Sequence, residues 1–254
     1  MTTMLVTGGT GTLGRHVVAR LGELGHDVRV LSRHSAAYPV DLRDGSGLDA
    51  AVAGVDVVVH CASTRTGGDE QAASNLVAAA KRAGVGHLVL ISIVGVDRVP
   101  LGYYATKLRV EKIIEGSGIG WTVLRTTQFH DLVFTILHGA AKLPLMPVAS
   151  GVRIQPVETA EVSARLAALA ARAPAGRVAD MGGPEVHTLR ELAQLYLRAT
   201  GRRRVLVPLW VPGRTFRALQ RGLNLAPDQA VGKRTFEDFL RERARTAGPG
   251  TSVR

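Results

Sequence analysis

The sequence predicts a doubly wound parallel α/β domain that carries a small C-terminal lobe. Three observations predict this class: short apolar runs alternate with longer helical segments, glycines end several of those segments, and a glycine-rich turn follows the first apolar run. Nearly continuous apolar runs are typical of parallel strands that are covered on both faces. In such a sheet, ligands are expected at the carboxyl ends of the strands.

The first half of the chain shows a regular alternation of elements. Strands are expected at 4–8, 26–32, 55–62, 87–92 and 121–127. Helices are expected at 11–25, around 46–53, at 71–84 and from Tyr103 to Ser117. Gly25 and Gly84 stand where a helix would end, because glycine adopts the left-handed conformation of a C-cap at little cost.

The chain after Phe129 is less regular. Residues 137–151 hold two prolines and two glycines and predict a loop over the top of the sheet. A helix is expected at 159–173, a strand at 176–183, and a helix at 188–201 with Thr188 and Glu191 as a capping box. A strand and one or two helices are expected within 202–243. The predicted domains are a core at 1–150, a substrate-side lobe at 151–243 interleaved with it, and a disordered tail at 244–254.

Composition excludes several classes of protein. Of 254 residues, 46% are hydrophobic, which is enough for a sizeable core. The one cysteine, Cys61, excludes an internal disulfide framework, and eight histidines without ligand spacing predict no metal site. No secretion signal is visible, and the apolar runs are shorter than the roughly 18 residues of a membrane span. We therefore expect a soluble, cytoplasmic protein without a membrane partner.

Positive charge is concentrated near the C-terminus. The net charge is +11, and residues 201–245 hold eleven Lys and Arg against four Asp and Glu. A basic surface can serve an anionic ligand or a nucleic acid, or it can simply be solvated. Because arginine-rich composition is a common bias, we expect a solvated surface and no nucleic-acid partner.

The stretch LVTGGTGTLGRHVV places Gly8, Gly11 and Gly14 between the first strand and the first helix. In such a loop one glycine turns the chain, the next lets the backbone approach a pyrophosphate, and the third allows close packing of helix on strand. The phosphate then lies at the N-terminus of the helix. The position after a strand and before a helix distinguishes this loop from an ordinary flexible turn, and it predicts a dinucleotide cofactor.

The end of the second strand indicates which dinucleotide. Proteins that prefer NAD usually have an acid there, which accepts from the ribose hydroxyls and repels a 2′-phosphate. This chain has Ser32 and Arg33 instead, and Arg15 follows the last glycine of the loop. Arginine matches phosphate geometry, so NADP(H) is expected to be preferred, although either arginine could simply be exposed. Asp41 and Leu42 stand where the chain could line the adenine; Asp41 could equally be a turn residue.

These motifs together resemble the short-chain dehydrogenase/reductase superfamily, and within it the extended and atypical branches that include the NmrA-like NAD(P)-binding proteins. The matching residues are TGGTGTLG (7–14), DL (41–42), HCAS (60–63), HLVLIS (87–92), YYATK (103–107) and WTVLR (121–125). The resemblance covers about residues 3–200 and implies a Rossmann fold, with 1–150 as its NADP-binding core. It implies further cofactor contacts at Thr7, Thr12, Leu13, Cys61, Ala62, Ser63, Lys107 and Thr126.

The resemblance also implies a catalytic set of a strand-ending serine, a tyrosine and a lysine, which are Ser92, Tyr103 and Lys107 in this sequence. Residues four apart share one face of a helix. A tyrosine titrates near about 10 unaided, and a neighbouring lysine cation lowers that pKa. Lys107 would also hold the nicotinamide ribose, and Ser92 would orient the substrate carbonyl. The alternative is structural: Lys107 pairs with Glu111 at i,i+4.

Residues after the fifth strand are candidates for the substrate pocket, because superfamily members shape the nicotinamide pocket there. Gln128, Phe129 and His130 are expected to line it, and His130 as a second acid or base is an alternative.

The sequence thus predicts an NADPH-dependent reductase of a carbonyl, quinone or related conjugated small molecule, with Tyr103 as proton donor. Two alternatives stay open: a non-catalytic NADP(H)-binding redox sensor that acts through a protein partner, and an epimerase or isomerase that takes hydride and returns it. A homo-oligomer also stays open.

Overall fold

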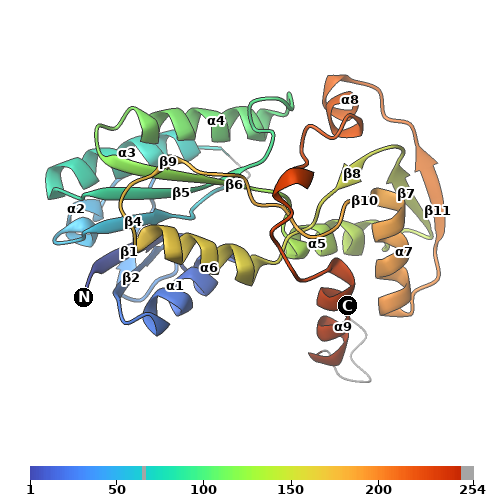
Figure 1. The fold of residues 1–254 in the computed structure, drawn as a ribbon, viewed down its shortest axis with the longest axis horizontal. Helices are drawn as coiled ribbons and strands as arrows, with labels where there is room; N and C mark the ends of the chain where they lie inside the picture. The colour runs from blue at the N-terminus through green and yellow to red at the C-terminus, as the bar shows by residue number, and fades with distance from the viewer. Residues whose placement is uncertain (65–66, 247–254) are drawn as a thin grey trace. The chain divides into compact units, whose positions relative to one another are not determined.

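The computed structural model describes residues 1–64 and 67–246. The chain divides into two compact units (Figure 1). Unit 1 comprises Met1–Asp97, Leu101–Thr126 and Thr159–Asp180. Unit 2 comprises Arg98–Pro100, Thr127–Glu158 and the chain from Met181 onward. In the described residues, no helix has both the length and the apolar character needed to cross a membrane.

Unit 1 contains a seven-stranded sheet with the order β3-β2-β1-β4-β5-β6-β9, and all of its strand pairs are parallel. The strands are β1 (Thr3–Thr7), β2 (Asp27–Ser32), β3 (Tyr38–Pro39), β4 (Val57–His60), β5 (His87–Ile93), β6 (Gly120–Thr126) and β9 (Gly176–Arg177). The strand order reverses between β1 and β4, which is the topological switch point where such sheets bind ligands. The predicted doubly wound parallel fold is confirmed.

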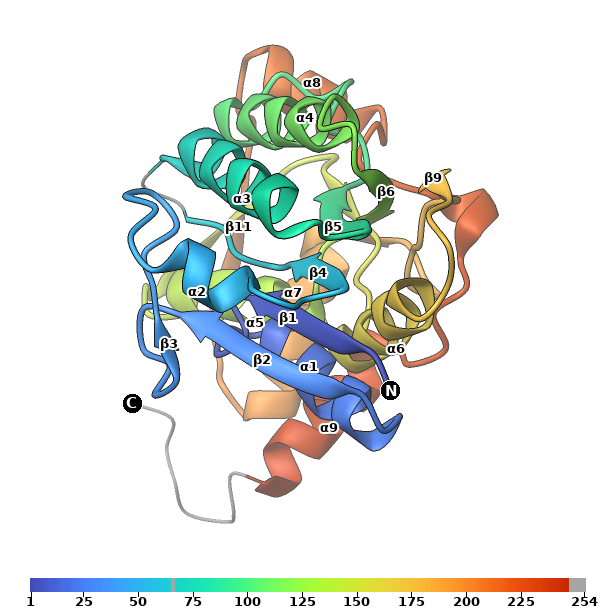
Figure 2. The same cartoon turned by 90° about the vertical axis from the view of Figure 1, so that its left-hand side faces the viewer.

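Helices cover both faces of this sheet (Figure 2). The helices of unit 1 are α1 (Gly14–Glu23), α2 (Leu48–Val52), α3 (Asp69–Ala83), α4 (Gly102–Glu115) and α6 (Thr159–Ala170). Helix α1 packs beside α6 on one face, and α3 packs between α2 and α4 on the other. The core between the sheet and the helices α2, α3 and α4 contains the fully buried side chains of Leu5, Val58, Leu88 and Val123. These strands are apolar on both faces because helices exclude water from both.

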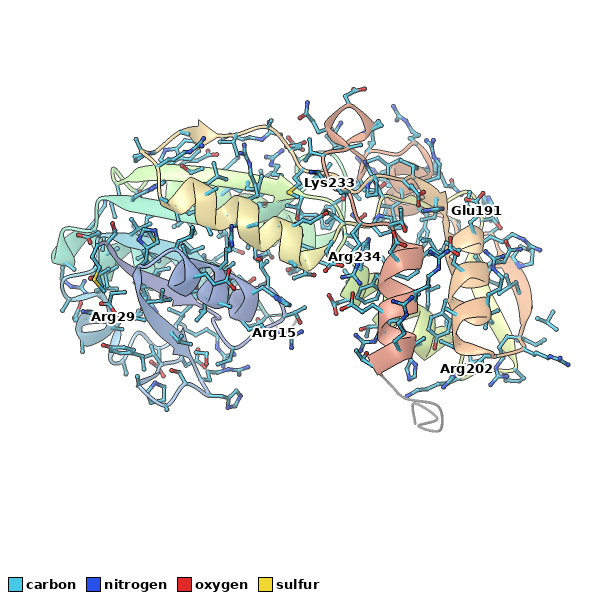
Figure 3. The ribbon with its side chains drawn as sticks, turned by 60° about the horizontal axis from the view of Figure 1, so that its bottom comes forward. Arg15, Arg29, Glu191, Arg202, Lys233 and Arg234 are labelled. Carbon is cyan, nitrogen blue, oxygen red and sulfur yellow. The ribbon has the colours of Figure 1, made fainter. Side chains whose placement is uncertain are left out.

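Unit 2 is built from short elements around an aromatic core. Its helices are α5 (His130–Ala140), α7 (Leu189–Thr200), α8 (Arg214–Gln220), a 3₁₀ turn (Pro227–Gln229) and α9 (Phe236–Thr246). Its strands form two pairs, β7 (Leu145–Ala149) with β11 (Val205–Leu209) and β8 (Arg153–Ile154) with β10 (His187–Thr188). The core includes Phe134, Tyr196, Phe236 and Phe239. Thr188 and Glu191 form the predicted capping box at the start of α7 (Figure 3).

The second half of the chain differs from the prediction in several places. Residues 137–151 are not a loop: α5 continues to Ala140, and β7 follows, with Met146 and Val148 buried in unit 2. The strand expected at 176–183 is only the two residues of β9. The proline- and glycine-rich composition suggested a loop, but pairing with β11, distant in sequence, makes residues 145–149 a strand.

The division into units also differs from the expected boundary at residue 150. The chain leaves unit 1 after Thr126, returns as α6 and β9, and leaves again after Asp180. Helix α6 belongs to unit 1 because its apolar side packs on α1. Of the tail expected at 244–254, residues 244–246 are the end of α9, and 247–254 lie outside the described residues.

Candidate functional site

The glycine loop between β1 and α1 is folded tightly on itself. Gly8 has a φ of +65°, a conformation that favours glycine, and a Cβ there would lie 2.8 Å from the backbone of Ala62. A Cβ on Gly14 would lie 2.2 Å from the carbonyl oxygen of Gly8. Helix α1 begins without a side-chain cap and without an acid in its first turn. This N-terminus therefore favours a bound anion electrostatically.

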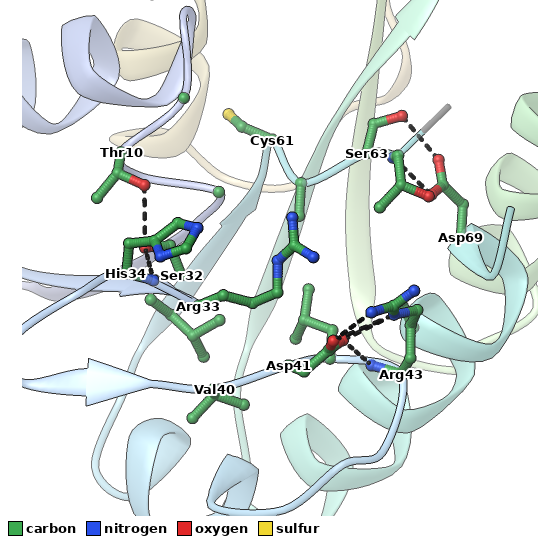
Figure 4. Close-up of a pocket in the computed structure, with 17 residues that line it drawn as sticks. Thr10, Ser32, Arg33, His34, Val40, Asp41, Arg43, Cys61, Ser63 and Asp69 are labelled. Carbon is green, nitrogen blue, oxygen red and sulfur yellow. Dashed lines mark hydrogen bonds and ion pairs between the residues drawn. The ribbon is translucent and has the colours of Figure 1, made fainter. Parts of the chain in front are cut away.

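A pocket lies in unit 1 where β1, β2 and β4 end (Figure 4). Nine of the residues predicted to bind the cofactor line it: Gly8, Gly11, Ser32, Arg33, Asp41, Leu42, Cys61, Ala62 and Ser63. Their common origin is the carboxyl edge of the sheet, where the strands of a parallel sheet bring separate loops together. The structure thus gathers the glycine loop, the end of β2 and the HCAS segment around one pocket.

Two arginines, Arg33 and Arg43, lie at one side of the pocket. Arg33 extends into the pocket from the end of β2 (Figure 4). Arg43 binds Asp41 through two of its nitrogens, Nη2 at 2.5 Å and Nε at 3.0 Å, each from one carboxylate oxygen. Hydrogen bonds from Arg43 hold the pKa of Asp41 well below its usual range, so that carboxylate stays charged. Arg33 forms no salt bridge within the described residues, although its charge contributes to the low pKa of Asp41, and its guanidinium adds positive charge to the pocket.

Short hydrogen bonds fix the loops that form the pocket. The hydroxyl of Thr10 donates to the Ser32 hydroxyl at 2.9 Å, which ties the glycine loop to the end of β2. Thr7 and His60 Nδ1 lie 2.7 Å apart, and Thr7 also accepts from the backbone N–H of Ala62. Thr7 is not one of the residues that line the pocket. Its contacts hold the end of β1 to the end of β4 and to the segment that follows β4.

A polar cluster that contains Tyr103 and Lys107 lies at the other side of the pocket. The Tyr103 hydroxyl is 2.9 Å from the hydroxyl of Ser63, and Ser63 donates to Asp69 at 2.7 Å. The ammonium of Lys107 is 3.9 Å from the same Asp69 oxygen. Ser63 and Asp69 line the pocket, and Tyr103 is 38% exposed. The cluster therefore joins an accessible hydroxyl to a buried ion pair.

Burial changes the ionisation of the groups around Lys107. Burial lowers the pKa of Lys107, and the charge of Asp69 opposes that effect. Burial, together with the Lys107 charge, lowers the pKa of His60 to about 3, so its imidazole is neutral at physiological pH. Burial raises the pKa of the Cys61 thiol to about 12, which keeps it a thiol. Cys61 is thus a small apolar neighbour of the pocket, not a nucleophile.

The remaining predicted cofactor residues lie outside the lining of this pocket. Gly14, Thr12 and Leu13 belong to the glycine loop, and Thr126 ends β6. Arg15 lies in the first turn of α1 (Figure 3). Ser92 ends the predicted fourth strand and is 2% exposed. The Ser92 hydroxyl has no hydrogen-bond partner among the described residues. The serine that contacts the Tyr103 hydroxyl is therefore Ser63 and not Ser92.

Gln128, Phe129 and His130 belong to unit 2. His130 is fully buried, its ring packs against Phe236 and Phe239, and its Nδ1 lies 3.4 Å from Glu158. The pocket role predicted for residues 128–130 stays a prediction. Within the described part of the chain, no three His, Cys, Asp or Glu side chains are grouped closely enough to hold a metal ion.

Sequence reasoning missed eight residues that line the pocket: Thr10, Leu31, His34, Val40, Arg43, Thr64, Asp69 and Ala72. Arg43 directly follows the DL motif and could have been found from that position. Asp69, the first residue of α3, gave no signal, because an acid at a helix start is an ordinary stabilising feature.

Comparisons with known proteins agree with this geometry. A sequence model of a family described as NAD(P)H-binding matches residues 8–135. The (4-alkanoyl-5-oxo-2,5-dihydrofuran-3-yl)methyl phosphate reductase of Streptomyces griseus is 31% identical over 218 residues, which cover 78% of this chain and 74% of that protein. Quinone oxidoreductase 2 of Escherichia coli is 26% identical over 212 residues, with coverages of 78% and 74%.

Solved structures show the same fold. An NADPH-dependent quinone oxidoreductase from Escherichia coli, complexed with NADPH, superposes with a TM-score of 0.80 at 21% identity, over 94% of this chain and 99% of that one. A nucleoside-diphosphate-sugar epimerase from Staphylococcus aureus gives a TM-score of 0.78 at 20% identity, over 95% and 100%.

The tight glycine loop gives a direct test of this geometry. Gly14→Ala is expected to lower the free energy of unfolding by about 1–3 kcal/mol, because its Cβ meets the carbonyl of Gly8 and the backbone must move. The control is Gly22→Ala in the same helix, where a Cβ meets nothing within 4 Å. That variant is expected to be neutral or stabilised by about 0.5–1 kcal/mol. Urea unfolding followed by circular dichroism measures both, and equal stability of the two variants would contradict the close approach.

Proposed function

Because the chain belongs to the NAD(P)H-binding family and, as its motifs indicate, to the short-chain dehydrogenase/reductase superfamily, we propose that it is an NADPH-dependent reductase of a small carbonyl, quinone or related conjugated compound. The observation that carries the proposal is the Tyr103 hydroxyl, which lies beside the pocket residue Ser63 and one helical turn from the buried cation Lys107. A pure nucleotide-binding protein has no need of a proton-donating group there.

The residues of the pocket fit a dinucleotide. The cradle between Gly8 and Gly14 leaves no room for a Cβ, as a loop that lets its backbone approach a pyrophosphate requires. Arg33 would meet a 2′-phosphate, and no acid at the end of β2 would repel one. Leu31, Val40 and Ala72 give the pocket apolar surface against which an adenine would pack. NADPH is thus the cofactor that this set of side chains favours.

The names of two relatives support the reaction class. One is named as a reductase of a furanone phosphate and the other as a quinone oxidoreductase. Both substrates are conjugated and carry a carbonyl group. We therefore propose a conjugated substrate that carries a carbonyl group.

In this reaction a bound NADPH supplies hydride, and the protein supplies the proton and the positions. Tyr103 gives its hydroxyl proton to the oxygen that becomes an alcohol. Lys107 stabilises the phenolate that Tyr103 becomes, because an opposite charge one turn away favours the ionised form. The buried hydroxyl of Ser92 has an unused donor with which it would hold a substrate oxygen.

The cofactor preference is tested at Arg33. Arg33→Ala is expected to weaken NADPH binding by about tenfold or more and to leave NADH binding nearly unchanged, because a charge-assisted hydrogen bond is worth about 1.5–3 kcal/mol. The measurement is a fluorescence titration with each nucleotide at one salt concentration. Arg20→Ala removes an equal charge from an exposed ion pair with Glu23 and is expected to change neither affinity. Equal losses of affinity for NADPH and NADH in Arg33→Ala would contradict the assignment of Arg33 to the 2′-phosphate.

The proton donor is tested at Tyr103. Tyr103→Phe is expected to lower kcat by about 10²–10⁴ and to leave the Kd for NADPH within a factor of about two, since general acid catalysis contributes about that much. The neighbouring Tyr104 is buried, and Tyr104→Phe is the matched control, expected to keep most of the activity. Turnover and nucleotide titration measure the two effects separately. Full activity in Tyr103→Phe would remove the assignment and leave the cofactor proposal intact.

A further inference from the structure

Asp69 is a buried carboxylate with more partners than its position at a helix start requires. Its side chain is 4% exposed. One oxygen accepts from the backbone N–H of Thr64 at 2.8 Å, and the other accepts from the hydroxyl of Ser63 at 2.7 Å. The ammonium of Lys107 lies 3.9 Å from the second oxygen. The carboxylate is therefore held by two hydrogen bonds and faces the cation that the proposed reaction uses.

These contacts decide which way the protons point. A carboxylate has no hydrogen to give, so the hydroxyl of Ser63 is the donor in its bond to Asp69. The single hydrogen of Ser63 is thereby committed. In the 2.9 Å contact between Ser63 and Tyr103, the phenol must then be the donor. The chain of donors runs from Tyr103 through Ser63 to Asp69, and this order requires Tyr103 to be protonated.

Several titratable groups around this chain of hydrogen bonds are neutral or paired with a partner of opposite charge. On the β4 side, burial brings the pKa of His60 to about 3 and that of Cys61 to about 12, so both are uncharged at neutral pH.

Three further acids of unit 1 are engaged by arginines. Glu111 binds Arg125 at 2.6 Å, and the exposed Glu70 binds Arg109 at 2.8 Å. Asp97, on the other side of Arg125, is bound to it at 2.9 Å. Among the described residues, the sequence of contacts Tyr103–Ser63–Asp69–Lys107 links the Tyr103 hydroxyl to one buried carboxylate and one buried ammonium group.

We propose that Asp69 is a positioning residue that, through Ser63, orients the Tyr103 hydroxyl and keeps it protonated at neutral pH. Lys107 alone would favour the phenolate, and Tyr103 would then lose the proton that it has to donate before a substrate binds. The Asp69 carboxylate opposes ionisation of Tyr103 in two ways. Its negative charge repels a phenolate two hydrogen bonds away, and it accepts the one hydrogen with which Ser63 could otherwise stabilise that phenolate. The use of this arrangement in catalysis rests on the proposed function; the ionisation of Tyr103 does not.

The test reads the ionisation of Tyr103 directly, without substrate or cofactor. The phenolate absorbance is titrated with pH, and the contribution of Tyr103 is isolated by subtracting the Tyr103→Phe form of each variant. Asp69→Asn is expected to lower the pH at which Tyr103 ionises by roughly one unit, because it removes a buried negative charge two hydrogen bonds from the phenol. Glu70→Gln, one residue along the same helix, removes an equal charge that already pairs with Arg109 and is expected to leave the midpoint in place.

Ser63→Ala provides a second variant that keeps Asp69 and tests the same chain. It removes the acceptor of the Tyr103 hydroxyl while the charge of Asp69 remains, so a shift in the same direction but smaller is expected. Circular dichroism at each pH checks that the variants stay folded. An unmoved midpoint in folded Asp69→Asn, or in folded Ser63→Ala if Asp69→Asn does not fold, would overturn the proposal, and so would an equal shift in Glu70→Gln.

The two proposals fail in different ways. If the midpoint shifts as expected and no substrate is reduced, the positioning by Asp69 stands and the reductase function falls. If substrates are reduced and the midpoint does not move, the function stands and the role of Asp69 falls.

Discussion

The candidate site of unit 1 depends on the contact between Gly14 and the carbonyl of Gly8. Because a Cβ at Gly14 would lie 2.2 Å from that carbonyl, the loop can close only with glycine at this position. Closure places the start of α1 directly at the end of β1, and the start of α1 carries no side-chain cap and no acid. The loop thus leaves backbone amides where a phosphate can meet them. The loops after β2 and β4 complete the pocket around this cradle, and the hydrogen bond between Thr10 and Ser32 ties the glycine loop to the end of β2.

Burial determines which groups of the site carry charge. His60 and Cys61 lie close to Lys107, yet burial keeps the first unprotonated and the second protonated. The hydrogen bonds of Tyr103 and Ser63 lead to a pair of one cation and one carboxylate, Lys107 and Asp69, which are both almost inaccessible to water. In such a place two opposite charges influence a neighbouring hydroxyl strongly, since little solvent screens them. The exposed arginines of the pocket act on an incoming anion, whereas the buried pair acts on the proton donor.

The sequence predicted those parts of the fold and site that local chemistry determines. The glycines, the apolar strands and the capping box of Thr188 with Glu191 each follow from the residues at those positions. What tertiary pairing decides was predicted less well. Residues 145–149 become a strand because they pair with β11, some sixty positions later, and α6 belongs to unit 1 because it packs on α1. Likewise, no spacing in the sequence indicates that Tyr103 meets Ser63, forty residues earlier, or that Asp69 faces Lys107.

The most direct test of the central claim is the stoichiometry of NADPH oxidation over a panel of ketones, enones and quinones. A reductase must convert one NADPH to NADP⁺ for each molecule of reduced product, which absorbance of the nucleotide and mass spectrometry of the product measure together. The account predicts this one-to-one ratio for at least one conjugated carbonyl compound or quinone. Tight binding of NADPH with no oxidation anywhere in the panel would contradict it and indicate a sensor, and a rearranged substrate with no net oxidation would indicate an isomerase.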